Sequence, residues 1–128
     1  MAQSITPLAK ALYLCDGTIG FPNQKTDIVG LFNSIRPPHY PYVHPQFVVF
    51  AQLSGGLGQV PFFINVRLAA TGQLVCSTSA RLLNFAHRDQ VVQLSYTIPG
   101  CQFRQPGVYL VELLCNAQCV ADVKVELQ

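Results

Sequence analysis

Hydrophobic and polar residues alternate along most of this 128-residue chain. Residues 62–69 show the pattern most clearly, because Phe62, Ile64 and Val66 fall on one face of an extended strand while Asn65 and Arg67 fall on the other. Successive side chains of a strand point to opposite faces, so a period of two is typical of an antiparallel strand with one buried face. The same pattern predicts strands over residues 9–16, 26–35, 47–53, 62–69, 73–83, 91–98, 108–115 and 119–127.

About eight strands without a convincing helix predict an all-β fold, and we expect one domain over residues 1–128. Pro106 and Gly107 precede Tyr109 at the start of a late strand, as in the tyrosine corner of immunoglobulin-like folds, where the hydroxyl bonds back to an upstream main-chain group. We therefore assign structural roles to these three residues. The predicted architecture is an immunoglobulin-like antiparallel β-sandwich with a Greek-key type crossover.

Residues 34–47, SIRPPHYPYVHPQF, form a proline-rich and aromatic segment that we call the strap. Proline fixes φ and biases the preceding residue toward extended conformations, which suits a segment that crosses between two sheets without joining a ladder. The favoured interpretation is therefore architectural. The strap also holds the candidate binding residues of the chain, which are Arg36, His39, Tyr40, Tyr42 and His44.

Three connecting segments carry turn signals instead of strand patterns. Residues 17–23 contain glycine, proline and asparagine and predict a loop, and SGGLG at 54–58 predicts a flexible hairpin connection. Residues 84–90, NFAHRDQ, lack strand character and predict a loop or one helical turn. These segments set the boundaries of the predicted strands.

The chain is poor in charge, with 11% charged residues against roughly 25% in soluble domains. Such a surface favours self-association or a permanent protein partner. The net charge is +2 and the basic residues are scattered singly, which argues against nucleic-acid binding. No apolar run reaches the roughly 18 residues that span a bilayer, and the N-terminal residues lack a leader pattern, so we expect a cytoplasmic protein without membrane contact.

Five cysteines are spread through strand-like sequence, an odd number that favours reduced, buried thiols over a disulfide framework. Cys115 and Cys119 flank a predicted hairpin turn. Their side chains could lie close enough, on neighbouring strands, to form a disulfide under oxidising conditions. This disulfide stays open as the minor alternative.

No catalytic set can be assembled from the sequence. His39 and His44 in the strap and His87 further along match no familiar zinc spacing, so we expect no metal and no other cofactor. Glu112 lies among apolar residues and is the one carboxylate open to partial burial, for which pairing with an arginine across the sheet or solvent exposure is favoured. Because no nucleophile, base and orienting group occur together, we expect no enzyme activity.

The segments ALYLCD, KTDIVGLFNSI, His44-Pro45 and PGVYLVELLCNAQCVADVKVEL together resemble a family of small, free-standing bacterial β-sandwich proteins of unknown function. The resemblance covers nearly the whole chain and implies a fold without known catalytic residues. Members usually carry Asp-Gly in the last hairpin, where this chain has Asn116-Ala117. A type I′ turn there would require a positive φ at Ala117, which alanine tolerates poorly.

Three functional hypotheses follow. The first is a protein-interaction or scaffolding module that presents an edge strand or the strap to another protein or to a second copy. Residues 47–53 support it because both faces are apolar, although a central strand covered on both sides would show the same pattern. The second is a binder of small ligands or carbohydrates through the strap residues named above. The third is a metal-dependent or catalytic protein.

Overall fold

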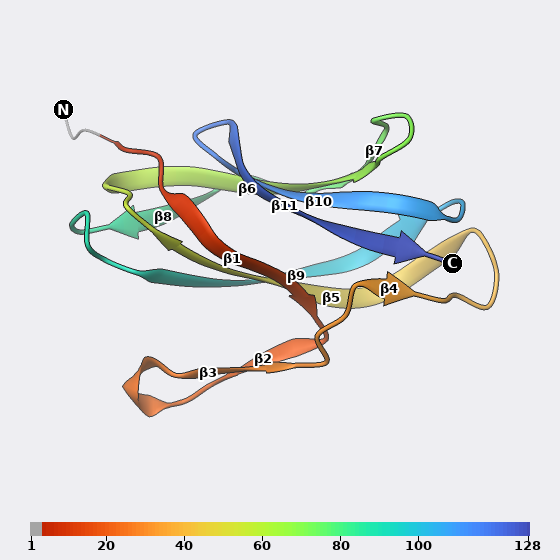
Figure 1. Ribbon diagram of the computed structural model, residues 1–128, viewed down its shortest axis with the longest axis horizontal. Coiled ribbons are helices and arrows are strands. Elements are labelled where there is room, and N and C mark those ends of the chain that lie inside the picture. The colour runs from red at the N-terminus through yellow and green to blue at the C-terminus, as the bar shows by residue number, and fades with distance from the viewer. Residues whose placement is uncertain (1–3) are drawn as a thin grey trace.

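A computed structural model describes residues 4–128 of the chain and shows two β-sheets packed face to face (Figure 1). The three-stranded sheet is antiparallel and has the order β1 (Leu8–Cys15), β5 (Tyr42–Ser54), β9 (Val92–Phe103). The six-stranded sheet has the order β4 (Ser34–Ile35), β11 (Gln118–Leu127), β10 (Gly107–Cys115), β6 (Gly58–Leu68), β7 (Leu74–Ser77), and β8 (Arg81–Phe85) also pairs with β6. The predicted all-β fold with packed antiparallel sheets is confirmed.

A third element, here called the arm, projects from the two packed sheets (Figure 1). It consists of β2 (Gly17–Gly20), a single 3-10 turn η1 (Pro22–Gln24) and β3 (Thr26–Val29), with β2 and β3 paired only with each other. The sequence predicted a loop over residues 17–23, and this prediction is wrong for β2. A two-stranded ribbon buries little surface by itself, so its stability depends on what it packs against.

The core lies between the inner faces of the two sheets. Alternate residues of β6 and β10 point into it, which is the pattern predicted for residues 62–69. The bulkiest fully buried side chains are Tyr109, Phe47, Phe85 and Phe103. Removing this apolar surface from water supplies the main driving force for packing the sheets together.

The arm covers part of the outer face of the three-stranded sheet. Val48 and Phe50 of β5 point away from the main core and are buried with Cys15, and Ile28 of β3 packs against them. The Thr26 hydroxyl also donates a hydrogen bond of 2.8 Å to the Gln93 side-chain oxygen on β9. The two apolar faces of residues 47–53 are therefore those of a central strand covered on both sides.

Two predicted strands are each divided in the structure. Residues 26–35 break at Gly30, whose φ of 69° interrupts the extended backbone between β3 and β4. Residues 73–83 break between β7 and β8, where the Thr78 hydroxyl accepts a hydrogen bond of 3.0 Å from the Ile64 main-chain N–H. The alternation changes phase at both breaks, because Phe32 and Ile35 both pack against the core, as do Cys76 and Leu83. The residues on either side of each break are strand-like, so the sequence pattern predicted continuous strands.

The predicted hairpin at residues 54–58 is wrong, because β5 and β6 do not pair. β5 belongs to the three-stranded sheet and β6 to the six-stranded sheet, so this segment carries the chain from one sheet to the other. Gly55 and Gly58 have φ values of 80° and 77°, a region that glycine enters without steric cost. These glycines therefore allow the chain to turn from one sheet into the other.

The strap crosses between the two sheets, as predicted. It leaves β4 in the six-stranded sheet and enters β5 in the three-stranded sheet. Its last part differs from the prediction, because β5 begins at Tyr42 and pairs with β9 from Tyr42↔Phe103 onward. The segment without ladder partners is therefore shorter than expected and spans residues 36–41.

The tyrosine corner is present. The Tyr109 hydroxyl donates a hydrogen bond of 2.7 Å to the Gln105 main-chain oxygen, and the Tyr109 ring meets Phe103 edge to face with centroids 4.9 Å apart. The immunoglobulin-like strand order itself stays a prediction.

Among the residues that the structure describes, no helix has the length and apolar character needed to cross a membrane.

Candidate functional site

The first half of the strap binds Gln128, the residue that follows β11. The Arg36 guanidinium donates to the Gln128 side-chain oxygen at 2.7 Å, and the Tyr40 hydroxyl donates to the Gln128 main-chain oxygen at 3.0 Å. The Tyr40 ring also packs against the core. Two of the five predicted binding residues are thus used to hold the strap against the end of β11.

The second half of the strap forms an aromatic cluster. His44 lies between Phe32, Phe47 and Tyr42, with ring centroids 6.1, 5.9 and 5.7 Å away, and its Nδ1 is 3.1 Å from the Tyr42 hydroxyl. Burial lowers the pKa of His44, although the Asp16 carboxylate acts in the opposite direction. His44 is therefore held mainly as a neutral ring.

The five predicted strap residues do not converge on one hollow. Arg36 and Tyr40 meet at Gln128, Tyr42 and His44 contact each other, and His39 is exposed. The ligand-binding role of the strap stays a prediction. Its contacts with the rest of the chain agree with the architectural interpretation.

Glu112 pairs with Arg67 across neighbouring strands, as favoured from the sequence. The Arg67 Nε donates to Glu112 Oε1 at 2.8 Å between β6 and β10. Asn65, the buried polar residue of this region, accepts a hydrogen bond of 2.7 Å from the Ser77 hydroxyl on β7. Each of these polar side chains thus has a hydrogen-bond partner on a neighbouring strand, as polar groups with a structural role do.

In residues 4–128, no three histidine, cysteine, aspartate or glutamate side chains are grouped so that they could hold a metal ion.

All five cysteines are free thiols. Cys115 is buried, whereas Cys119 is exposed and lies opposite Leu114 in the β10–β11 register. Because Leu114 and Cys115 point to opposite faces of β10, Cys119 faces away from Cys115, and the predicted alternative of a bridge between them is wrong.

A thiol pair that the sequence did not indicate joins the two sheets. Cys76 on β7 and Cys101 on β9 lie on strands that contact each other across the sandwich, and their thiols interact. This interaction lowers the pKa of Cys76 to about 7, against the opposing effect of burial. The same interaction, together with burial, raises the pKa of Cys101. The two residues are far apart in sequence, so no local pattern could have revealed the pair.

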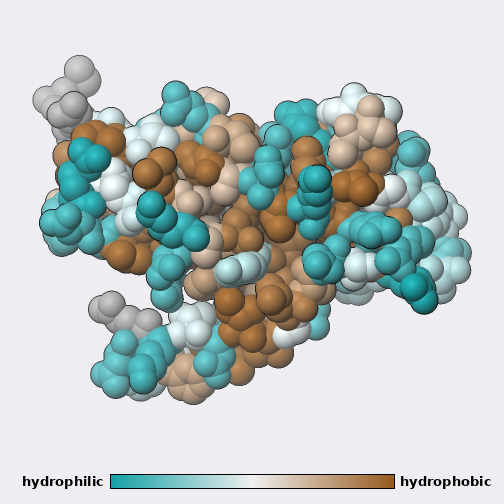
Figure 2. Space-filling model, viewed as in Figure 1, coloured by the Kyte–Doolittle hydropathy of each residue, from teal (hydrophilic) through white to brown (hydrophobic). Residues whose placement is uncertain are grey.

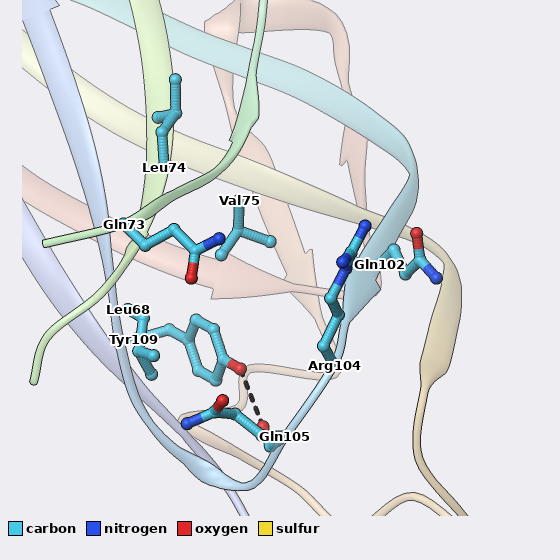
Figure 3. Close-up of a pocket in the computed structure, with 8 residues that line it drawn as sticks. All are labelled: Leu68, Gln73, Leu74, Val75, Gln102, Arg104, Gln105 and Tyr109. Atoms are coloured by element: carbon cyan, nitrogen blue, oxygen red, sulfur yellow. Dashed lines mark hydrogen bonds between the residues drawn. The ribbon is translucent and has the colours of Figure 1, made fainter. Parts of the chain in front are cut away.

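A small hollow of about 190 Å³ lies between β7, the end of β9 and the tyrosine corner (Figure 3). Gln73 and Val75 lie on one side of it, Gln102 and Arg104 on another, and Tyr109 lies at its base. The wall mixes amide groups and a guanidinium with apolar side chains. We call this feature the glutamine hollow.

A second concavity, the β1 groove, has a volume of about 380 Å³. It opens at the seam where β1 of one sheet approaches β11 of the other, and β1 and β11 contact each other without pairing. The lining residues include no charged side chain and comprise Leu12, Tyr13, Leu14, Leu31, Phe32, Asn33 and Val123. Leu31 and Tyr13 remain 61% and 44% exposed. Figure 2 shows hydrophobic residues gathered where the arm leaves the packed sheets.

The model of a protein family described as a family of unknown function, DUF6941, matches residues 10–128. The chain belongs to this family. The sequence motifs resembled a family of unknown function, and this resemblance is thereby confirmed. The matched residues include the strap, the thiol pair and both concavities of this DUF6941 member.

A search of curated proteins gave no match to the chain. The solved structures that resemble this DUF6941 member include an alkylpurine DNA glycosylase, AlkC, from Pseudomonas fluorescens, bound to DNA containing an abasic site analogue. The identity is 16% and the TM-score 0.46, and the aligned part covers 75% of this chain and 27% of the glycosylase. At this level the similarity carries no functional argument.

Proposed function

We propose that this DUF6941 member is a non-enzymatic protein-interaction module that binds an extended, apolar polypeptide segment of a partner protein in the β1 groove. The observation that supports the proposal is the position of the groove, which combines an uncharged lining with the edges of two strands. A partner that adds a strand at such an edge gains main-chain hydrogen bonds, and side-chain pockets supply its specificity.

β1 is an edge strand of the three-stranded sheet. Among the described residues, its outer edge carries one isolated bridge, between Leu14 and Phe32. On the other wall, β11 pairs with β10 along its length and with β4 only at Glu126 and Leu127. Main-chain donors and acceptors therefore border the groove on both sides, and an extended peptide matches them better than a sugar or a lipid chain does.

The exposed apolar side chains determine the chemistry expected of the partner. Leu31 and Tyr13 flank the groove and would be removed from water by an apolar segment. Exposed apolar residues that are contiguous, instead of scattered, are typical of interaction sites. The low charge of the whole chain points in the same direction. Its free thiols fit a reducing compartment such as the cytoplasm.

A displayed library of random peptides tests this proposal. We expect the purified chain to enrich peptides with alternating apolar residues, and the substitution Leu31→Asp to weaken their binding at least tenfold, because it places a charge beside the apolar lining. Leu82→Asp is the matched control, since Leu82 is also 61% exposed but lies on β8, outside the groove. Bound peptide should slow amide hydrogen exchange in β1.

Two outcomes would overturn the proposal. One is that the enriched peptides bind the Leu31→Asp variant as tightly as the unchanged chain. The other is a dimer in sedimentation equilibrium that Leu31→Asp dissociates and Leu82→Asp does not, because the occupant of the groove would then be a second copy. The alternative of ligand binding through the strap has weaker support, since Arg36 and Tyr40 already bind Gln128.

A further inference from the structure

Cys76 and Cys101 are brought together by the packing of the two sheets. Cys76 lies on β7 and pairs with Val66 of β6 in the six-stranded sheet, and Cys101 lies on β9 and pairs with His44 of β5 in the three-stranded sheet. β7 and β9 contact each other across the sandwich, and both cysteines pack with the main core. The interaction of the two thiols is therefore a link between sheets.

Solvent reaches this pair from one side only. Cys101 is 1% exposed, whereas Cys76 is half-buried. The neighbouring residues Val75 and Gln102 line the glutamine hollow (Figure 3), but neither cysteine does, since successive side chains of a strand point to opposite faces. Because Cys76 itself is partly exposed, a small oxidant can approach it while Cys101 stays covered.

The electrostatic environment distinguishes the two sulfurs. The interaction with the Cys101 thiol lowers the pKa of Cys76, which favours the thiolate form of Cys76. Cys101 has a raised pKa and keeps its proton. Burial raises the pKa of Cys115 to about 11, and that of Cys119 is also raised. Cys76 is therefore the favoured nucleophile among these thiols.

We propose that Cys76 and Cys101 form a peroxide-sensitive dithiol pair, in which Cys76 is oxidised first and Cys101 resolves it into a disulfide between the two sheets. The proposal is independent of the function proposed for the β1 groove. Its reactants are the two thiols and hydrogen peroxide, and its products are one disulfide and two molecules of water.

The chemistry proceeds in two steps. The Cys76 thiolate attacks one oxygen of hydrogen peroxide, the O–O bond breaks, and an S–O bond forms to give Cys76 sulfenic acid and hydroxide. The Cys101 sulfur then attacks the Cys76 sulfur, the S–S bond forms and the S–O bond breaks. The Cys101 proton leaves with that oxygen as water, and the other water forms from the hydroxide and the proton first lost by Cys76.

The disulfide would fasten a short edge strand to the opposite sheet. β7 pairs with β6 over only Leu74–Ser77, so it has few hydrogen bonds to resist fraying. Closing a loop of roughly 25 residues should raise the midpoint of thermal unfolding by about 10 °C relative to the reduced chain. Oxidation would also fix the two strands that border the glutamine hollow.

Peroxide treatment followed by peptide mapping tests the proposal. We expect the reduced chain to lose two hydrogens in mass, to give a peptide linked through Cys76 and Cys101, and to return to its original mass with dithiothreitol. The exposed Cys119 should remain available to iodoacetamide. Sulfinic acid at Cys76 with Cys101 still free, or oxidation of Cys119 before Cys76, would contradict the proposal.

Substitution of the resolving thiol gives a second readout. In Cys101→Ala, peroxide should leave Cys76 sulfenic acid that dimedone traps, whereas the unchanged chain and Cys119→Ser should show little trapping. Without peroxide, iodoacetamide at pH 7 should modify Cys76 more slowly in Cys101→Ala than in the unchanged chain, since the Cys76 thiolate loses its interaction with the Cys101 thiol.

Circular dichroism establishes that the variants fold, and Cys101→Ser replaces Cys101→Ala if the smaller side chain prevents folding. Dimedone trapping at the same level in Cys101→Ala, Cys119→Ser and the unchanged chain would show that Cys101 does not resolve Cys76. That result would overturn the assignment.

Discussion

The Tyr109 hydroxyl donates a hydrogen bond of 2.7 Å to the Gln105 main-chain oxygen, four residues upstream at the turn before β10. The Tyr109 ring is buried against Phe103, and its hydroxyl reaches the edge of the glutamine hollow (Figure 3). One side chain therefore anchors the entry to β10 both through the core and through the main chain. Burial also raises the pKa of Tyr109, which keeps the hydroxyl protonated as a donor.

We expect Tyr109→Phe to lower the free energy of unfolding by about 1 kcal/mol, because it removes the hydrogen bond and keeps the ring. Urea unfolding followed by circular dichroism measures the change. Tyr13→Phe is the control, since Tyr13 is 44% exposed and its loss of a hydroxyl should change the stability by less than about 0.5 kcal/mol. Equal effects of the two substitutions would show that the corner hydrogen bond does not stabilise the fold.

The turn between β10 and β11 holds an alanine in a conformation that favours glycine. Asn116 and Ala117 have φ values of 52° and 62°, and Cys115 pairs with Gln118 across the turn. Two positive φ values at the central positions are those of a type I′ turn. The Asn116 side chain donates to the Thr6 hydroxyl at 2.8 Å, and its main-chain N–H donates to the Pro61 oxygen at 2.9 Å. These contacts help to hold the turn despite the alanine.

Replacing Ala117 by glycine should therefore stabilise the chain by about 0.5–1 kcal/mol, because glycine enters this region without steric cost. Thermal or urea unfolding provides the measurement. Ala121→Gly in the neighbouring strand β11 is expected to have the opposite sign, since glycine weakens an extended strand. A loss of stability on Ala117→Gly would mean that the alanine methyl group makes a favourable contact that exceeds the backbone strain.

The features that the sequence predicted depend on local chemistry. Alternation at residues 62–69 predicted the inward face of β6, and Pro106, Gly107 and Tyr109 predicted the corner, because a tyrosine two positions after glycine reaches the preceding turn. The strap was correctly predicted to cross between sheets, since the prolines of its first half do not fit a ladder, although the part from Tyr42 onward pairs with β9. Each of these inferences needs only residues that are close in the chain.

The features that the sequence did not reveal depend on which strands meet in space. The glycines at 54–58 are compatible with both a hairpin and a corner between sheets, and only the pairing of β6 with β10 decides between them. The pattern of residues 47–53 likewise does not show that the arm covers Val48 and Phe50. The Cys76–Cys101 pair and the β1 groove both arise where the two sheets face each other, which no period of two encodes.

The half-buried His44 should make the stability of the chain depend on pH. Burial lowers the pKa of His44 below its usual value of 6.5, so the folded chain binds a proton at this site less readily than the unfolded chain does. The unfolded state therefore takes up more protons as the pH falls through about 6.5, and the free energy of unfolding decreases. The contribution of His44 is fully present at higher pH and is lost on acidification.

We expect the difference in the free energy of unfolding between pH 7.5 and pH 5.5 to become smaller in His44→Gln, because glutamine cannot titrate but still offers an oxygen to the Tyr42 hydroxyl. Urea unfolding at the two pH values measures this difference. His39→Gln is the matched control, since His39 is exposed in the same strap and its substitution should leave the difference unchanged. If His39→Gln and His44→Gln reduce the pH dependence equally, desolvation within the aromatic cluster is not its cause.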